Sequence, residues 1–334
     1  MTDTFKWAIF SPGRIARQFA DAACHLDGCT ITAVASSSLA RAQAFADNYA
    51  VPHVFNSYQH LLEQVEIDAV YIASVHSMHH EQIRLCLNAG IPVLCEKPIT
   101  VNATELKQLI TIASQKKLFL MEALWTRFLP VTNQVKSWLD MGAIGNLQHI
   151  QASFGFESNA LATDRLKNPN LAGGVLLDLG IYPIAMSQYF NPYSVKEVTA
   201  KAILGETGVD EQLTVRLGYD NGVISEFICS MNNNYENNLK LVGDAGSIEI
   251  NAPFWGATAA KLVQTNATKT FDNPHIVNGF EYQILAAIDA INNKQLEALQ
   301  MPLGDSLNNM RLMDTIRAQI GVLYPFESDS ITDT

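Results

Sequence analysis

The chain has 334 residues, of which 48 % are hydrophobic, and a formal net charge of −11. This length suits two domains, and this composition supplies a sizeable core and argues against disorder. The negative charge argues against nucleic acid or an anionic membrane as the main partner. The chain starts without a basic segment followed by an apolar one, and it has no continuous apolar run of membrane-spanning length. We therefore expect neither a signal peptide nor a membrane span.

The cysteines are an odd, scattered set without a CxxC pair: Cys24, Cys29, Cys86, Cys95 and Cys229. This pattern indicates free thiols in a reducing compartment, so we expect a cytoplasmic protein. His79 and His80 are adjacent and cannot point the same way along a helix. Because nothing else in the sequence has metal-ligand spacing, we predict no metal site.

The first 123 residues alternate short apolar runs with helical patterns. Strands are predicted at 6–10, 30–36, 53–55, 68–74, 92–96 and 118–122, and helices at 14–26, 39–50, 58–64, 78–90 and 102–117. Strands that are apolar throughout and alternate with helices indicate a parallel sheet covered on both faces. The fold class predicted for residues 1–123 is therefore α/β, an N-terminal doubly wound Rossmann sheet that binds a dinucleotide.

Residues 124–334 have a different pattern. A helix is predicted at 128–142, a strand at 147–157, a helix at 173–190, four to six further strands, and helices at about 278–293 and 305–321. Hairpin signals occur at Asp220-Asn221-Gly222 and at Gly243-Asp244-Ala245-Gly246. We therefore expect an α+β domain with an open, mostly antiparallel sheet.

The turn after the first predicted strand reads Ser11-Pro12-Gly13-Arg14-Ile15-Ala16. A dinucleotide fingerprint would place GxGxxG/A here, and Gly13 matches its second glycine. Ser11 replaces the first glycine, and Pro12 has no N–H to offer a phosphate. The motif alone leaves an ordinary turn open, but a helix N-terminus attracts anions. We predict that the cofactor contacts Ser11, Gly13, Arg14 and Ile15.

The end of the second predicted strand bears on the choice of cofactor. An NAD-binding fold usually has an acidic residue there, whereas this chain has Ser36, Ser37 and, further on, Arg41. Hydroxyls and a guanidinium can bind a 2′-phosphate, so NADP is predicted to be preferred, with NAD possible. Alternatively the serines cap the following helix, and both can hold.

Several motifs in order carry a resemblance to a known family. They are GRIA in the first turn, LCEKP (94–98), MEALWTRFLP (121–130), GGVLLDLGIYPI (173–184), ETGVDEQLTV (206–215) and IGVLYPFE (320–327). The chain resembles the Gfo/Idh/MocA oxidoreductases over nearly its whole length. It is most similar to the branch of dimeric dihydrodiol dehydrogenases and NADP-dependent D-xylose dehydrogenases.

Lys97 and Tyr182 are the predicted acid/base pair. Hydride transfer from an alcohol requires a base for the hydroxyl proton, and the reverse reaction requires the same group as an acid. An isolated tyrosine or lysine, with a pKa of about 10, is too basic for this near neutrality, but neighbouring charge and burial lower that value. Much of the family has histidine where this chain has Tyr182, whereas the branch that it resembles has tyrosine. Asp178 precedes Tyr182 by four residues and shares its helical face.

The resemblance implies further site residues. Those expected at the cofactor are Ser74, His76, Glu96, Lys97, Pro98 and Arg127, and those expected at the substrate are His79, Trp125, Phe154, Trp255 and Phe280. Ser74 and His76 replace the threonine and asparagine usual in the family. Glu96 contacts the cofactor or holds Lys97, and His79 is alternatively a solvent-exposed helix residue. Each aromatic residue is alternatively part of the core.

The sequence thus predicts an NAD(P)-dependent oxidoreductase that prefers NADP. It would move hydride between a secondary alcohol of a sugar, polyol or trans-dihydrodiol and its carbonyl. The alternative is a non-catalytic NADP-binding sensor on the same fold, although such a protein has no need of Lys97, Asp178 and Tyr182. The resemblance also implies that the second domain, residues 124–334, binds substrate and forms a homodimer through the open face of its sheet.

Overall fold

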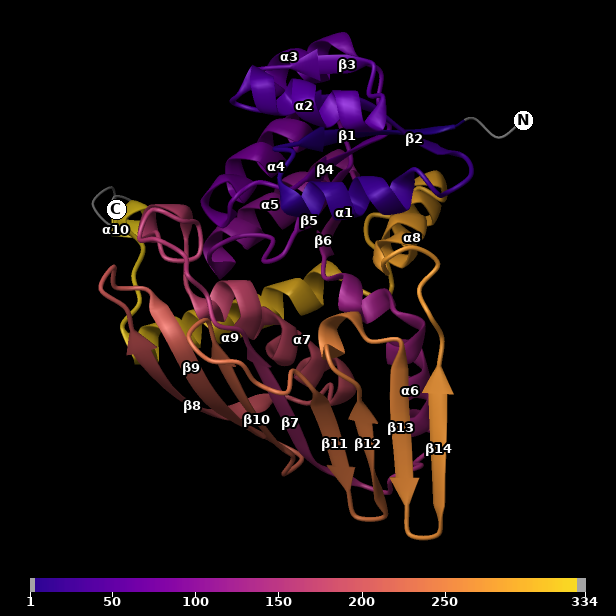
Figure 1. The fold of residues 1–334 in the computed structure, drawn as a ribbon, viewed down its shortest axis with the longest axis vertical. Coiled ribbons are helices and arrows are strands. Elements are labelled where there is room, and N and C mark those ends of the chain that lie inside the picture. Colours follow the sequence, from indigo (N-terminus) through magenta and orange to yellow (C-terminus); the bar gives the residue numbers. More distant parts are fainter. Residues whose placement is uncertain (1–3, 329–334) are drawn as a thin grey trace. The chain divides into compact units, whose positions relative to one another are not determined.

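The computed structural model describes residues 4–328, and the chain divides into two compact units (Figure 1). The first unit combines the residues up to Trp125 with His275–Leu307, and the second combines Thr126–Pro274 with the residues from Asn308 onward. The first crossing lies close to the boundary expected at 123. The return of residues 275–307 to the first unit was not expected from the sequence.

The first unit contains a six-stranded sheet in the order β3-β2-β1-β4-β5-β6. Its strands are β1 (Phe5–Phe10), β2 (Cys29–Ala35), β3 (His53–Phe55), β4 (Ala69–Ile72), β5 (Val93–Glu96) and β6 (Leu120–Ala123). Every neighbouring pair is parallel. All residues of β4, β5 and β6 are buried, as strands covered on both faces must be. The predicted Rossmann sheet is confirmed.

Helices connect these strands. They are α1 (Arg14–Ala23), α2 (Leu39–Tyr49), α3 (Tyr58–Gln64), α4 (His79–Asn88) and α5 (Ala103–Lys116), with a 3₁₀ turn η1 (His76–Met78) before α4. The side chain of Asn102 accepts from the N–H of Glu105 at 2.9 Å and thereby caps α5. The buried face of α1 consists of Phe19 and four alanines, so the helix can lie close to the sheet.

The unexpected segment of the first unit contains α8 (Phe280–Asn292), which packs against α1. The side-chain amide of Asn278 donates to the carbonyl of Gln18 at 2.9 Å. The N–H of Leu120 donates to the carbonyl of Leu296 at 3.1 Å. The segment therefore covers a helix of the Rossmann unit and also occupies the edge of its last strand, β6.

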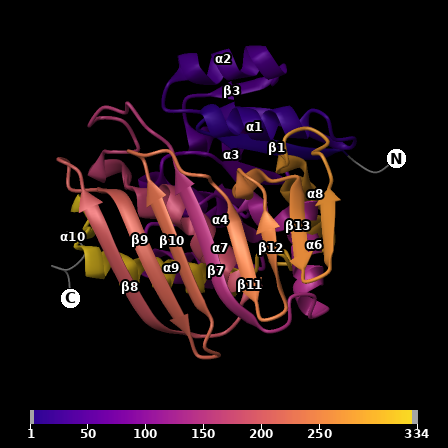
Figure 2. The ribbon, with the colours of Figure 1, turned by 60° about the horizontal axis from the view of Figure 1, so that its bottom comes forward.

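The second unit contains an eight-stranded sheet in the order β14-β13-β12-β11-β7-β10-β9-β8 (Figure 2). Its strands are β7 (Leu147–Gly155), β8 (Val195–Leu204), β9 (Asp210–Tyr219), β10 (Ile224–Ser230), β11 (Leu239–Gly243), β12 (Gly246–Ile250), β13 (Ala259–Gln264) and β14 (Ala267–Asp272). Both predicted hairpin turns join antiparallel strands. Among the described strands of this second sheet, only β7 and β10 pair in parallel, and more strands follow residue 190 than the sequence indicated.

Helices cover one face of this sheet. They are α6 (Pro130–Asp140), α7 (Ile181–Phe190) and the second half of α9 (Leu303–Ile320), and short helices η2 (Trp125–Phe128), η3 (Pro169–Leu171), η5 (Phe254–Gly256) and α10 (Pro325–Ser328) lie in the connections. The hydroxyls of Ser187 on α7 and Ser225 on β10 lie 2.7 Å apart inside this layer. In Figure 2 the strands stand in front with α7 and α9 behind them, and no described element covers the front.

The segment Pro169–Phe190 is long and apolar enough, by length and composition, to cross a membrane. The expectation of no such segment was based on continuous apolar runs and missed it. The protein buries 89 % of its most apolar window in its own interior, as a core segment requires. This segment includes the π-helix η4 (Leu176–Gly180), which runs directly into α7, where the sequence predicted one regular helix.

Candidate active site

The turn after β1 offers an open backbone at a helix N-terminus. Helix α1 begins after Gly13, and its described first turn has neither a capping side chain nor an acidic residue. A Cβ at Gly13 would meet nothing closer than the Ser11 carbonyl oxygen at 4.0 Å. The N–H groups of the first turn and the positive end of the helix dipole therefore suit a pyrophosphate.

Ser11 takes the backbone conformation that the missing glycine would provide. Its φ is 62°, in the left-handed region that favours glycine. Its hydroxyl lies 2.7 Å from the hydroxyl of Tyr58 on α3. Ser11 in place of the first glycine therefore keeps the conformation of the turn and adds a polar contact to it.

The three serines after β2 make different contacts, so the two roles that the sequence left open, helix capping and phosphate binding, fall on different residues. Ser38 caps α2 by accepting from the N–H of Arg41 at 3.4 Å. Buried Ser36 accepts from the N–H of Ser38 at 3.2 Å. Ser37 is exposed and accepts from the guanidinium of Arg41 at 3.2 Å. Ser37 and Arg41 therefore form the surface pair that suits a phosphate, whereas the hydroxyl of Ser36 is used within the turn.

The ends of the central strands meet at one edge of the Rossmann sheet. The N–H of Ser11 donates to the carbonyl of Ala35 at 2.9 Å, and the N–H of Ala73 donates to the carbonyl of Phe10 at 3.1 Å. Strand β5 follows β4 in register and brings Glu96 and Lys97 to the same edge. Open α/β sheets bind their ligands at this carboxyl edge.

The loop Lys97–Ile99 is held from both sides by buried side chains. The Lys97–Pro98 peptide bond is cis. An imidazole nitrogen of His79, on α4, lies 2.8 Å from the carbonyl oxygen of Pro98. On the other side, the carboxylate of Glu122, on β6, accepts from the N–H of Ile99 at 2.9 Å. The backbone on which Lys97 sits is therefore fixed by helix α4 on one side and by strand β6 on the other.

Glu96 points to the interior of the same loop. One oxygen of its carboxylate accepts from the hydroxyl of Tyr71 at 2.5 Å, and the other accepts from the N–H of Lys97 at 3.3 Å. Its side chain is buried. These contacts favour the role of holding Lys97 over the role of touching the cofactor.

His79 is placed differently from both expectations for it. The residue is fully buried, and its other ring nitrogen lies 3.2 Å from the carbonyl oxygen of Ser74. Burial lowers the pKa of His79 to about 4. The hydrogen bonds to the two carbonyls act to raise this pKa, whereas the charge of Lys97 acts to lower it. A neutral imidazole has one N–H, so it donates to one carbonyl at a time. His79 therefore ties two strand ends together instead of presenting a surface to substrate or solvent, and His76 packs beside its ring.

Trp125 and Phe280 are brought together within the first unit. Their ring centroids lie 4.9 Å apart, and His275 lies on the other side of Trp125 at 6.5 Å. A Cβ at Gly279 would lie 2.7 Å from the indole. Buried Glu281 accepts from the N–H groups of this loop, including that of Gly279 at 2.8 Å. Phe280 is buried, whereas Trp125 is partly exposed, so of the two Trp125 keeps the surface that a ligand needs.

The second unit surrounds Tyr182 with aromatic rings. Phe154 and Trp255 stack with centroids 3.5 Å apart and planes inclined by 7°. Tyr182 lies 5.6 Å from Phe154 and 6.4 Å from Trp255. Phe254 closes the cluster edge-on against Trp255. Trp255 is partly exposed, whereas Phe154 and Tyr182 are largely buried, so the cluster joins core and surface.

Asp178 has a partner that the sequence did not reveal. The guanidinium of Arg165 places its two terminal nitrogens 3.1 and 3.5 Å from the two carboxylate oxygens. The Arg165 side chain is 42 % exposed and that of Asp178 is 10 % exposed. Arg165 lies in the long loop before η3, and no spacing rule connects such a residue to a helix. Arg127 is buried with its guanidinium 4.2 Å from the centre of the Tyr189 ring, away from bulk solvent as expected.

Comparisons with known proteins agree with this architecture. Residues 5–124 match the model of an oxidoreductase family with an NAD-binding Rossmann fold, and residues 132–249 match the model of the GFO/IDH/MocA C-terminal domain. The chain belongs to the Gfo/Idh/MocA oxidoreductase family. It is an NAD(P)-dependent oxidoreductase, and the open α1 terminus fits the cofactor that this family binds.

Curated relatives and solved structures match nearly the whole chain. The trans-1,2-dihydrobenzene-1,2-diol dehydrogenase of Xenopus tropicalis is 33 % identical and covers 96 % of this chain and 99 % of its own. The mouse enzyme (Mus musculus) of that name is 34 % identical and covers 96 % of this chain and 98 % of its own. A 3-ketoreductase from Actinomadura kijaniata, solved with NADP and TDP-benzene, has a TM-score of 0.87 and is 26 % identical. The match covers 95 % of this chain and 98 % of the ketoreductase chain.

Proposed function

We propose that this enzyme prefers NADP and interconverts a secondary alcohol of a trans-dihydrodiol, sugar or polyol with its carbonyl. The observation that carries the proposal is Tyr182 set against the stacked rings of Phe154 and Trp255, one helical turn from Asp178. The similar proteins named above are a diol dehydrogenase and a ketoreductase, which are two directions of one chemistry. A bound nicotinamide cofactor would accept the hydride in oxidation and supply it in reduction.

Lys97 and Tyr182 are proposed to move the proton. In oxidation the phenolate form of Tyr182 takes the proton of the substrate hydroxyl, and in reduction the phenol returns it to the forming alkoxide. The ammonium group of Lys97 would stabilise negative charge that develops on the substrate oxygen. Solved variants of the ketoreductase replace a lysine by alanine and a tyrosine by phenylalanine, the two residue types assigned here.

The remaining residues orient rather than react. The stacked pair of Phe154 and Trp255 supplies a flat apolar wall, which suits the face of a six-membered ring. Asp178, oriented by Arg165, is placed to accept from a second hydroxyl of a diol or sugar. Ser37 and Arg41 would bind the 2′-phosphate that distinguishes NADP from NAD.

A substrate panel tests this function. Purified protein with NADP is mixed with trans-1,2-dihydrobenzene-1,2-diol, D-xylose, D-glucose and myo-inositol, and NADPH formation is followed by absorbance. Turnover of at least one diol or sugar is expected, with NADP used better than NAD. Tight NADP binding without turnover of any diol, aldose or polyol, and without reduction of diketones by NADPH, would instead support a sensor.

The homodimer and the cytoplasmic location are proposed on separate grounds. The uncovered face of the eight-stranded sheet carries half-buried Ile224 and Ile228 on β10 and exposed Ile203 on β8, which a second copy could bury. The free edge of β8 is occupied, because the side-chain amide of Gln319 bonds the N–H of Ala200 and the carbonyl of Val198. Pairing through the face is therefore favoured over pairing through the edge. Light scattering that shows only monomer at micromolar concentration would contradict the dimer.

All five cysteines are free, which is compatible with the reducing environment of the cytoplasm. Burial raises the pKa of the thiols of Cys86, Cys95 and Cys229, so these groups stay protonated and inert. Fractionation of the native host that recovers the protein with secreted proteins would contradict a cytoplasmic location.

A further inference from the structure

Two glycines begin the segment that carries Asp178 and Tyr182. A Cβ at Gly173 would lie 2.8 Å from the carbonyl oxygen of Leu166, and a Cβ at Gly174 would lie 2.2 Å from a carboxylate oxygen of Asp210. Gly174 also has a φ of 116°, which other residues rarely adopt. The glycines therefore allow two neighbours to approach the backbone closely at this point.

The first neighbour is the carboxylate of Asp210, at the start of β9. Asp210 is 1 % exposed, and one of its oxygens accepts from the N–H of Leu176 at 2.7 Å. This N–H belongs to the first turn of η4, where the helix itself provides no acceptor. A carboxylate at this end is also favoured by the helix dipole. Asp210 therefore fixes where the helical segment begins.

The carbonyl group of Gly173 has a further partner in Tyr324, close to the end of the described chain. Tyr324 is 1 % exposed, and its hydroxyl donates to the carbonyl oxygen of Gly173 at 2.8 Å. The two residues are 151 positions apart in the sequence. Tyr324 thus restrains the backbone on the side of the glycine pair opposite to Leu176.

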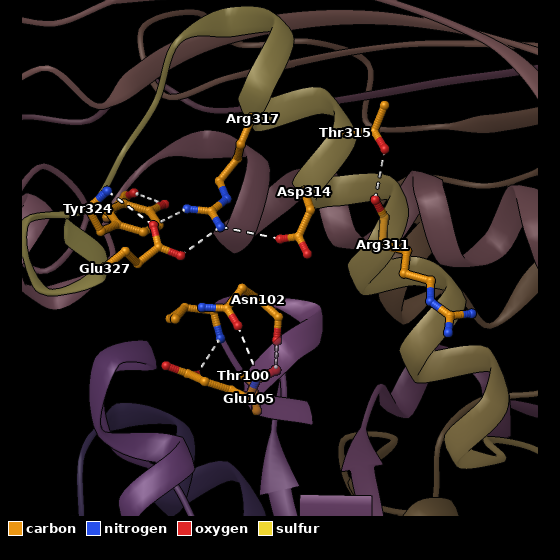
Figure 3. A network of polar contacts seen from close by, with 11 residues as sticks. Thr100, Asn102, Glu105, Arg311, Asp314, Thr315, Arg317, Tyr324 and Glu327 are labelled. Carbon is orange, nitrogen blue, oxygen red and sulfur yellow. Dashed lines mark hydrogen bonds and ion pairs between the residues drawn. The ribbon is translucent and has the colours of Figure 1, made fainter. Parts of the chain in front are cut away.

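Tyr324 is itself held rigidly (Figure 3). The guanidinium of Arg317 lies 4.9 Å from the centre of the Tyr324 ring and bonds both carboxylate oxygens of Glu327, at 2.7 and 2.9 Å. Glu327 also accepts from the N–H of Tyr324 at 3.2 Å. A paired guanidinium and carboxylate have a fixed mutual geometry, so the phenol is directed by a rigid support.

We propose that Tyr324 and Asp210 are positioning residues, which fix the backbone at Gly173–Leu176 and thereby the directions of Asp178 and Tyr182. The inference rests on the proposed acid/base role of Tyr182. The π-helix adds weight, because its wider turns have few alternatives once the first turn is set, and such turns are frequent at functional sites. A displacement of roughly 1 Å in an acid/base group can cost about 10²-fold in rate.

Kinetics of two conservative variants test this inference. In Tyr324→Phe and Asp210→Asn, measured with NADP and trans-1,2-dihydrobenzene-1,2-diol, kcat is expected to fall about tenfold or more. The Kd for NADPH should stay within about twofold, because neither residue is assigned to the cofactor. The matched control is Tyr219→Phe, which also removes a buried hydroxyl from the second unit. That hydroxyl has no hydrogen-bond partner in the described chain, so kcat should not change.

Hydrogen exchange of the NADP-loaded protein gives a measurement that does not depend on turnover. Amides of residues 175–182 should exchange faster in both variants than in the wild type and in Tyr219→Phe, while the strands of the sheet keep their protection. Unchanged exchange at 175–182 in both variants would overturn the inference. So would a loss of protection spread over the whole second unit together with an unchanged kcat, because that describes a merely structural role.

A third variant separates this inference from the proposed function. If Tyr182→Phe keeps wild-type turnover, the acid/base assignment is wrong, and hydrogen exchange still decides whether Asp210 and Tyr324 fix the segment. If Tyr182→Phe is inactive while Tyr324→Phe and Asp210→Asn retain full kcat, the assignment stands and the positioning inference is wrong.

Discussion

The loop that carries Lys97 and the helix that carries Tyr182 are held by the same kind of contact, from very different distances along the chain. In each case buried side chains bond the backbone beside the functional residue. The contacts near Lys97 span 19 and 23 residues, from His79 and to Glu122. The contacts at the start of the Tyr182 segment span 34 and 151 residues. The contacts near Lys97 join neighbouring strand–helix units, so they can be inferred from nearby sequence. The contacts near Tyr182 depend on the complete second unit.

The largest effects should come from the two functional residues themselves. Lys97→Met and Tyr182→Phe should each lower kcat by about 10² to 10⁴-fold, the usual contribution of acid–base catalysis, while the Kd for NADPH changes little. Steady-state kinetics and fluorescence titration measure the two quantities. The controls are Lys107→Met and Tyr193→Phe, which alter exposed residues of the same types. Near-wild-type turnover in either functional variant would refute its assignment.

Acid should change the stability contributed by one buried group in each unit, with opposite signs. The group in the second unit is Asp210. Burial raises the pKa of Asp210 from 3.8 to about 7, against the amide of Leu176 and the charge of Arg317. Between these values the native carboxyl binds a proton and the unfolded one does not. Its contribution to the free energy of unfolding therefore falls as the pH rises from about 4 to about 7.

Urea unfolding of the wild type and Asp210→Asn at both ends of this window measures that contribution. The stability of the wild type relative to the variant should be a few kcal/mol higher at the acid end. The titratable groups facing Asp210 are Tyr324 and Cys229, and burial raises the pKa of both, so neither ionises in this window. A difference that does not vary with pH would show that Asp210 is already ionised throughout.

His79 should produce the opposite trend in the first unit. Burial lowers its pKa from 6.5 to about 4, so between these values the unfolded imidazole binds a proton that the native one does not. Its contribution to stability is present above pH 6.5 and is lost as the pH falls to about 4. The stability of the wild type relative to His79→Gln, from urea midpoints, should decrease on acidification. An increase would mean that the native imidazole is protonated.

The smallest predicted effect concerns cofactor choice. Arg41→Met and Ser37→Ala should weaken NADPH binding by about tenfold and about threefold, as expected for a lost charged and a lost neutral hydrogen bond. NADH, which lacks the 2′-phosphate, should bind with nearly unchanged affinity. Arg311→Met removes an exposed arginine from α9 and serves as the control for net charge. Equal losses for both cofactors would remove Ser37 and Arg41 from the 2′-phosphate site.

The Rossmann half of the fold could be predicted because its signals are local. The run HVF at 53–55 is β3 itself, and VLCE ends at Glu96 as expected. The inner strands β4 and β5 and the last strand β6 are buried on both faces, so apolar composition alone marks them. The eight-stranded sheet was less accessible, because a parallel neighbour such as β10 beside β7 is set by packing between strands about 70 residues apart in the chain.

The site residues were assigned from motifs. Lys97 follows a predicted strand, and Asp178 and Tyr182 share a motif of the family that the chain resembles, so their roles stay predictions. Arg165 could not be found, because an exposed loop arginine has no periodicity that links it to Asp178. His79 was interpreted as a contact or surface residue because burial of both ring nitrogens depends on the carbonyls of Ser74 and Pro98, which only the folded chain brings together.

The return of residues 275–307 to the first unit has a consequence for the order in which the protein is made. When the ribosome has released the first 125 residues, α1 lacks its partner α8, and the N–H of Leu120 at the edge of β6 lacks the carbonyl of Leu296. The Rossmann unit therefore stays incomplete, with an unpaired strand edge, until the ribosome has released most of the second unit. A fragment that ends at residue 125 would expose the same edge, so a stable excised domain has to carry residues 275–307 on a linker.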